Sequence, residues 1–203
     1  MPCRIEDKST LQTASTAWAL FMAESFSGQG KAILSIHQRV HWTVRHREDE
    51  KTLGRLCEEE IRTALVSTGI PPEWIQTSLT HSAGCVLAIG YGGQHVLRVG
   101  VDLESAIRKV KAGIMDRVVS PQERGFKLEF LDYWVIKEAC YKANPDSAGT
   151  VVSDYQIVAF DPILLRGEVR GRMGAVWPLL RFQLCRVGGW RVAFAFSQSS
   201  GNL

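Results

Sequence analysis

Four short segments rich in apolar residues follow one another at the end of the chain, and Gly and Pro separate them. Segments of this length and composition, with turn residues between them, are typical of β-strands. The final quarter of the sequence therefore predicts a series of β-strands. The four segments are 151–160, 164–171, 179–187 and 190–198.

Three segments have the pattern of helices. In residues 45–69, apolar side chains recur at a spacing near 3.6, and Gly69 is well placed to end a helix. Residues 9–25 and 127–143 predict two further helices, and 32–37 predicts a strand. Strand and helix patterns thus occur on both sides of residue 98, so we expect an α+β fold with an N-terminal half, 1–98, and a C-terminal half, 99–203.

The middle of the chain predicts a hairpin followed by helical turns. Residues 84–91 and 95–103 are short apolar runs flanking a Gly-Gly-Gln turn, which favours pairing of these two strands. After Ser105 the pattern becomes basic and helical. The sequence Ser-Pro-Gln-Glu at 120–123 is a helix start, with serine as the cap, proline at the first position and glutamate at the third.

Composition excludes several classes of protein. The chain has 203 residues, and 24 basic against 21 acidic residues give a net charge of +3. This balance is too small to indicate nucleic-acid binding. Five scattered cysteines without a CxxC pair indicate neither a disulfide framework nor a structural zinc site, which fits a reducing cytoplasm. We expect no membrane segment, because no apolar run approaches the ~20 residues of a bilayer span.

Acidic and basic side chains recur at two places with spacings that share a face. Asp102 and Glu104 lie two residues apart at the end of a strand pattern, so both project to one side. Trp134, Glu138 and Lys142 lie four residues apart on one helix face, flanked by Lys137. Each pattern alone also describes a solvated strand edge or an ordinary Glu–Lys helix pair.

Together, the two patterns suit chemistry at a pyrophosphate. Mg²⁺ binds one or two carboxylates together with substrate phosphate oxygens, and lysine offsets charge that develops on phosphate. Upstream, Thr80 and His81 directly precede an apolar strand. Arg47, Lys51 and Arg55 form a stripe at spacing four, which is either a solvated helix face or a phosphate contact.

The ordered motifs resemble those of the 4′-phosphopantetheinyl transferases, in particular the longer single-chain class typified by the surfactin-synthetase activating enzyme. The matching segments are THSAG at 80–84, VGVDLE at 99–104, VVSPQE at 118–123 and WVIKEACYK at 134–142. The resemblance implies two similar α/β halves in a pseudo-twofold monomer, each a small antiparallel sheet packed with helices. Coenzyme A would lie in the cleft between the halves.

The resemblance also implies roles for individual residues. Asp102, Glu104 and Glu138 would bind Mg²⁺ with the pyrophosphate of coenzyme A, and Glu138 would be the base for a serine hydroxyl. Lys142 would lie by the pyrophosphate, with Lys137 more distant. His81 and Thr80, with Arg47 and Lys51, would contact the cofactor. The phosphopantetheine arm would pass to a serine of an acyl or peptidyl carrier protein, in pathways such as secondary metabolite biosynthesis.

Three departures from the family pattern stand in the sequence. The interval between Glu123 and Trp134 is short, the segment before His81 lacks the usual Gly-x-Pro-aromatic stretch, and Lys51 stands near a usual arginine. The short interval keeps open a second hypothesis, a non-catalytic descendant that binds coenzyme A or a carrier protein. In either case, we expect basic residues after the acidic motif, Arg108, Lys109 and Lys111, to attract an acidic carrier.

Overall fold

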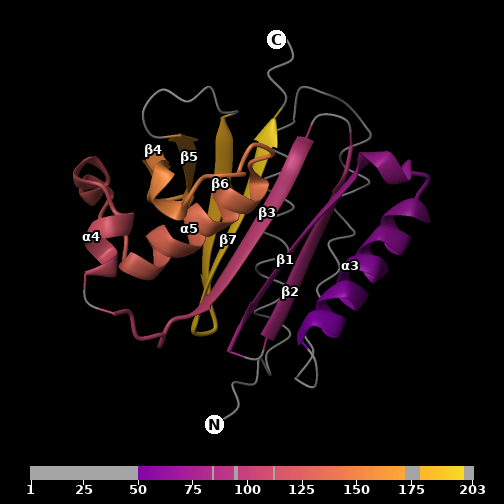
Figure 1. Cartoon of the computed structure of the whole chain (residues 1–203), viewed down its shortest axis with the longest axis horizontal. Helices are drawn as coiled ribbons and strands as arrows, with labels where there is room; N and C mark the ends of the chain where they lie inside the picture. The colour runs from indigo at the N-terminus through magenta and orange to yellow at the C-terminus, as the bar shows by residue number, and fades with distance from the viewer. Residues whose placement is uncertain (1–49, 84, 94–95, 112, 172–178, 199–203) are drawn as a thin grey trace.

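A computed structural model describes residues 50–83, 85–93, 96–111, 113–171 and 179–198. These residues form one antiparallel sheet of five strands and one antiparallel pair, with helices packed against both (Figure 1). The predicted α+β class is therefore confirmed. The expected helix at 9–25 and strand at 32–37 lie outside the described residues. The strands are β1 Ile75–Ser82, β2 Cys85–Gly92, β3 Val96–Ser105, β4 Tyr155–Asp161, β5 Arg166–Gly171, β6 Leu180–Val187 and β7 Trp190–Gln198.

The five-stranded sheet has the order β3-β7-β6-β5-β4. Its last four strands are the four segments predicted from the sequence, and each pairs with the next one along the chain. Strand β3 joins the sheet beside β7, with Asp102 opposite Ala193 and Glu104 opposite Arg191. The acidic motif therefore lies on an outer strand of the sheet.

The predicted pairing of 84–91 with 95–103 is wrong. Strand β2 pairs with β1 through a tight turn that places Ser82 opposite Cys85, whereas β3 pairs with β7. Ala83 takes a left-handed φ of 46° in that turn. Strand β1 escaped detection because Ser and Thr occupy one of its faces, so it lacks the apolar character by which strands are recognised.

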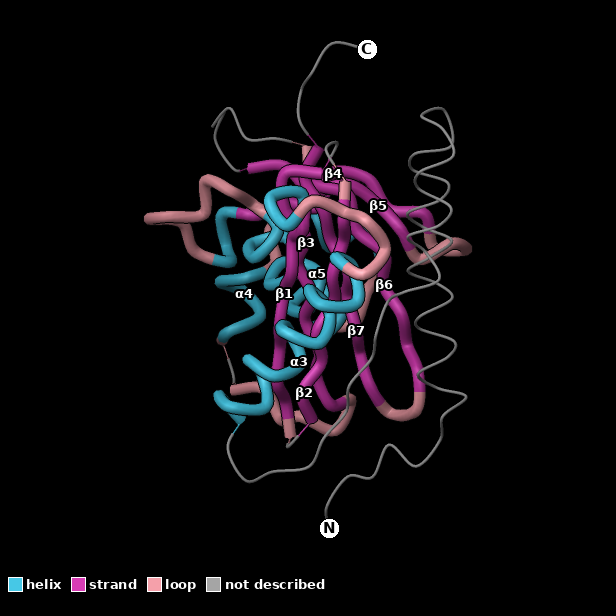
Figure 2. The backbone as a smooth tube through the Cα atoms, turned by 90° about the vertical axis from the view of Figure 1, so that its right-hand side faces the viewer, coloured by secondary structure: helices cyan, strands magenta, loops and turns pink. Residues whose placement is uncertain are grey.

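Helix α5, Phe130–Ala143, lies across one face of the five-stranded sheet (Figures 1 and 2). It is close to the predicted helix at 127–143. The helix can approach β3 closely because residue 100 is glycine: a Cβ there would lie 2.0 Å from the carbonyl oxygen of Ala139 and 2.7 Å from the amide nitrogen of Ala143. Gly100 therefore sets the distance between the last turns of α5 and the strand that carries Asp102.

The opposite face of the sheet forms a second apolar core, which includes Leu87, Ile89 and Tyr91 of β2. The other face of the β1–β2 hairpin packs against α3, Glu50–Val66, through Ile61 and Leu65 of the helix. Helix α3 agrees with the predicted helix at 45–69 over the described residues, and Gly69 follows it with a φ of 85°. A core shared between β2 and β3 holds the hairpin against the sheet.

The basic segment after Ser105 is mostly not helical, contrary to the prediction. Only α4, Ile114–Val118, forms there, preceded by Gly113 at a left-handed φ of 81°. The helix start predicted at 120–123 is confirmed as a short 3₁₀ segment, Pro121–Phe126. Glu123 accepts a 2.7 Å hydrogen bond from the backbone amide of Ser120, as a capping glutamate does. Within the described residues, no helix has the length and apolar character needed to cross a membrane.

Candidate active site around Asp102

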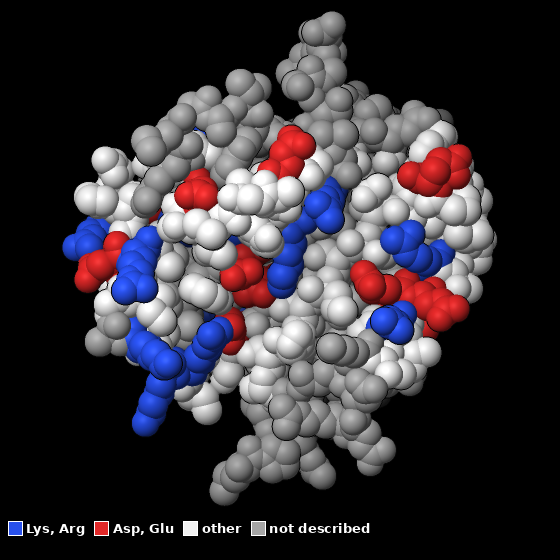
Figure 3. Space-filling view, viewed as in Figure 1, with Lys and Arg blue, Asp and Glu red and all other residues white. Residues whose placement is uncertain are grey.

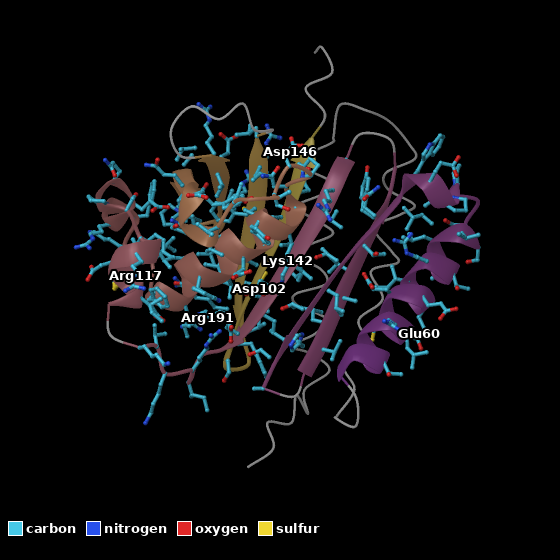
Figure 4. All side chains as sticks on the ribbon, viewed as in Figure 1. Glu60, Asp102, Arg117, Lys142, Asp146 and Arg191 are labelled. Atoms are coloured by element: carbon cyan, nitrogen blue, oxygen red, sulfur yellow. The ribbon has the colours of Figure 1, made fainter. Side chains whose placement is uncertain are left out.

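Asp102 and Lys142 form the centre of the site (Figure 4). Lys142 belongs to the last turn of α5. Its ammonium group donates hydrogen bonds to Asp102 Oδ1 at 2.8 Å and to the Val101 carbonyl oxygen at 3.0 Å. The close packing of α5 over Gly100 brings these groups together. The side chain of Lys142 remains 27% exposed and that of Asp102 only 9%. The pair thus connects a buried carboxylate to a cation that solvent reaches.

The two oxygens of Asp102 have different surroundings. Oδ1 accepts a second hydrogen bond, 2.9 Å long, from the hydroxyl of Thr80 on β1. Oδ2 is buried and has no hydrogen-bond partner among the described residues. A buried carboxylate oxygen without a partner is costly, so native proteins rarely keep one without a ligand, ion or catalytic role. Oδ2 is therefore the atom of Asp102 at which we expect a cation or a hydrogen-bond donor to bind.

Glu138 lies one helical turn before Lys142 and is half-buried. Burial raises the pKa of its carboxyl group, and the negative charge of Asp102 raises it further, whereas Lys142 and Arg108 lower it. The influence of Asp102 and Lys142 means that Glu138 shares their electrostatic environment. A carboxylate whose pKa is raised toward neutrality is better suited to accept a proton than an ordinary one.

Glu104 belongs to the same strand face but has its own partners. Its Oε2 accepts a 2.8 Å hydrogen bond from the hydroxyl of Ser82, and its Oε1 pairs with Arg108. The Arg108 guanidinium also lies over the ring of Trp134, 5.5 Å from the centroid, where a cation is attracted by the aromatic face. Trp134 is half-buried and packs against the core. In this structure, Glu104 is therefore neutralised by arginine rather than free.

An open hollow of about 490 Å³ adjoins this acidic strand end, and His81, Ser82, Glu104 and Arg108 contribute to its wall. His81 is exposed at its edge. Thr80 does not reach the hollow, because its side chain is buried and donates to Asp102. Of the two other predicted cofactor contacts, Arg47 lies outside the described residues and the side chain of Lys51 is not described.

The structure does not bring Lys137 to this site, which corrects its predicted contact with the cofactor. Its side chain has no exposed surface and its ammonium lies 2.8 Å from the carboxylate of Glu123. It also donates a 2.6 Å hydrogen bond to the carbonyl oxygen of Val118. Glu123 accepts a further hydrogen bond from the amide of Ile157 on β4. Lys137 therefore ties α5 to its neighbours inside the core, where no bound molecule reaches it.

The acids present suit a magnesium ion only in part. Within the described ranges, no three His, Cys, Asp or Glu side chains gather closely enough to hold a metal ion. Asp102, with its unpartnered Oδ2, and Glu138 are two hard oxygen donors in one environment. Mg²⁺ commonly takes one or two carboxylates and completes its shell with water and phosphate oxygens. Asp102 and Glu138 fit that pattern, whereas Glu104 would first have to exchange its arginine.

Lys and Arg side chains gather on the side of the molecule that carries α4 (Figure 3). Arg108, Lys109 and Lys111 are exposed along the segment before this helix. Large apolar side chains lie exposed among them, with Ile107 88% and Met115 43% exposed. The surface beside the acidic site thus combines positive charge with exposed apolar groups.

Two hydroxyl residues of the site were given no role from the sequence. Ser78 accepts a 3.1 Å hydrogen bond from the amide of Val101, and Ser82 binds Glu104. The available signal was the spacing: hydroxyls at 78, 80 and 82 alternate along a strand, as the acids do at 102 and 104. Detecting it required knowing that β1 lies beside β3.

Residues 98–168 match the family model described as the 4′-phosphopantetheinyl transferase superfamily. The match begins in β3 and ends in β5, and it includes Asp102, Glu104, Glu138 and Lys142. No curated protein matches the chain significantly. The family match supports phosphopantetheine transfer in general.

Proposed function

We propose that this chain transfers the 4′-phosphopantetheine arm of coenzyme A to a serine of an acyl or peptidyl carrier protein and releases adenosine 3′,5′-bisphosphate. The observation that carries the proposal is the Asp102 carboxylate. One of its oxygens is bound by Thr80 and Lys142, and the other is buried without a partner, inside a segment that matches the transferase family. This arrangement supports a site at which Asp102 would bind a cation and Lys142 would contact a phosphate group.

The residues would divide the chemistry between them. Asp102 and Glu138 would hold Mg²⁺, with Glu104 joining them once Arg108 is displaced, and the ion when bound would supply positive charge to the pyrophosphate oxygens. The serine oxygen would form a bond to the phosphorus that carries the pantetheine arm, and the bond from that phosphorus to the bridging oxygen would break. Glu138 would accept the serine proton, for which a raised pKa is favourable. Lys142 would stabilise negative charge on the departing phosphate.

The contacts proposed for the two substrates lie close together, because His81 and Arg108 border the same hollow. His81 borders the open hollow beside Glu104 and is our candidate for a contact with the 3′-phosphate of coenzyme A. The exposed segment containing Arg108, Lys109 and Lys111 is our candidate for attracting an acidic carrier protein. We also propose that the protein divides into halves 1–98 and 99–203, because strand and helix patterns occur on both sides of residue 98. Its 203 residues favour a monomer of the longer single-chain class, and its five scattered cysteines without a CxxC pair favour the cytoplasm.

The second candidate is a non-catalytic protein that binds coenzyme A or a carrier. The pairing of Glu104 with Arg108, which leaves only two carboxylates in the environment of Asp102, favours it. Intact-mass measurement of several apo carrier proteins, after incubation with the chain, Mg²⁺ and coenzyme A, separates the two candidates. Transfer predicts the mass gain of one phosphopantetheine arm on each accepted carrier. Bound coenzyme A without a mass gain on any carrier would favour the second candidate.

A further inference from the structure

Strand β1 lies along the free edge of β3, and side chains rather than backbone bonds join the two strands. The two strands belong to separate sheets among the described residues, yet they are neighbours in space (Figure 1). Three hydroxyls on alternate residues of β1 bridge the gap. Ser78 accepts from the amide of Val101, Thr80 donates to Asp102 and Ser82 donates to Glu104.

The match between hydroxyls and acids follows from strand geometry. Alternate residues of a strand project to the same side, so Thr80 and Ser82 have the same spacing as Asp102 and Glu104. The intervening residues of β1 serve the other side, where Thr77 donates a 3.1 Å hydrogen bond to Glu58 of α3. One face of β1 thus supplies a hydroxyl to each of the two acids of the candidate site.

Each hydroxyl binds only one oxygen of its carboxylate. Thr80 and Lys142 both donate to Asp102 Oδ1, and Oδ2 stays buried without a partner. Ser82 donates to Glu104 Oε2, and Oε1 pairs with Arg108, whose side chain is 45% exposed. The Arg108 end of this pair reaches solvent, whereas the Glu104 side chain is only 10% exposed, so Oε1 is the oxygen of Glu104 whose partner a cation could displace.

We infer that Thr80 and Ser82 are positioning residues, which fix the rotation of Asp102 and Glu104 so that one chosen oxygen of each carboxylate faces a divalent cation. This inference rests on the proposed function for the identity of the site, and it gives Thr80 a role other than contact with the cofactor. Groups that orient metal ligands commonly change metal affinity about 10-fold to 100-fold when they are removed. It also makes cation binding depend on docking of the hairpin against β3.

The test is the affinity of the full chain for Mn²⁺, a spectroscopic substitute for Mg²⁺, measured by electron paramagnetic resonance. Thr80→Val removes the hydroxyl and keeps the shape of the side chain, and Ser82→Ala does the same at a half-buried position. Thr77→Val is the matched control, because it removes a hydroxyl–carboxylate bond from the opposite face of the same strand. Thr80→Ser keeps the hydroxyl and should restore binding.

We expect Thr80→Val to weaken Mn²⁺ binding about 10-fold to 100-fold and Thr77→Val to change it by less than about 2-fold. If Thr80→Val does not fold by circular dichroism, Ser82→Ala decides, with an expected loss of at least about 10-fold. Equal affinities of the folded variants and the wild type would overturn the inference, as would a wild type that binds no Mn²⁺. Absence of arm transfer by a wild type that binds Mn²⁺ would instead count against the proposed function alone.

Discussion

Replacing Gly100 with alanine tests whether close packing of α5 on β3 builds the site. The added Cβ would lie 2.0 Å from the Ala139 carbonyl oxygen and 2.7 Å from the Ala143 amide nitrogen. Both atoms belong to the backbone, so no side chain can rotate away. Ordinary contact begins near 3.4 Å, so helix and strand would have to separate by more than ~1 Å. That shift would draw Lys142 away from Asp102.

The magnitude follows from two opposing effects. Overpacking a core costs about 1–3 kcal/mol, and a backbone clash belongs at the upper end of that range. Replacing glycine by alanine recovers about 0.4–1 kcal/mol by restricting the unfolded chain. The net loss should be about 2 kcal/mol in the free energy of unfolding. For a chain of this length, that lowers Tm by about 4–8 °C.

The assay is thermal unfolding followed by circular dichroism, with Gly125→Ala as the control. A Cβ at Gly125 would meet no atom within 4 Å, so this variant should lose no stability. If Gly100→Ala unfolds at the same temperature as Gly125→Ala, the helix does not depend on glycine at this position. The explanation given for the contact between Lys142 and Asp102 would then be refuted.

Three further predictions concern individual side chains. Lys137→Met should lower the free energy of unfolding by about 3–5 kcal/mol in urea titration, because Glu123 would remain buried without its cation, and a loss below about 1 kcal/mol would contradict the placement of this pair. In metal-free protein, the pKa of Glu138 is raised in the folded state above its ordinary value of 4.5, so folding favours the protonated carboxyl group. The resulting stabilisation is complete below pH 4.5 and is lost as the pH rises through the raised pKa. Glu138→Gln should therefore be more stable than the wild type at pH 8, with the difference in Tm vanishing toward pH 4; a constant difference would argue against this origin. His81→Ala should raise KM for coenzyme A and leave KM for the dephospho form nearly unchanged, and equal increases would rule out a contact with the 3′-phosphate.

The strands of the final sheet and helix α5 could be predicted because their patterns are local. Each of the last four strands could be recognised from an apolar run between Gly and Pro residues, and in the structure each pairs with its neighbour in sequence. Strand β3 was assigned to the wrong partner because its true partner, β7, lies some ninety residues further along the chain. The Gly-Gly-Gln turn favours a local hairpin, and the local sequence does not indicate the pairing of β3 with the distant strand β7.

The candidate site was predictable in its residue types but not in its contacts. Alternation placed Asp102 and Glu104 on one face, and helical spacing joined Glu138 to Lys142. Helical spacing also left Lys137 beside that face, yet its side chain is buried against Glu123, because the direction of a side chain at the flank of a helix depends on tertiary packing. Thr80 was expected to contact the cofactor, whereas it binds Asp102, since only the fold reveals that β1 borders β3.

The measurement that tests the central claim most directly is the intact mass of an apo carrier protein after incubation with coenzyme A, Mg²⁺ and either wild type or Asp102→Asn. Asparagine keeps an oxygen to accept from Thr80 and Lys142 and replaces the unpartnered oxygen with an amide nitrogen, so the fold should persist. Asp116→Asn, at an exposed carboxylate, is the control. We predict the gain of one phosphopantetheine arm with the wild type and the control, and none with Asp102→Asn. Transfer by Asp102→Asn at the wild-type rate would contradict the role assigned to this carboxylate.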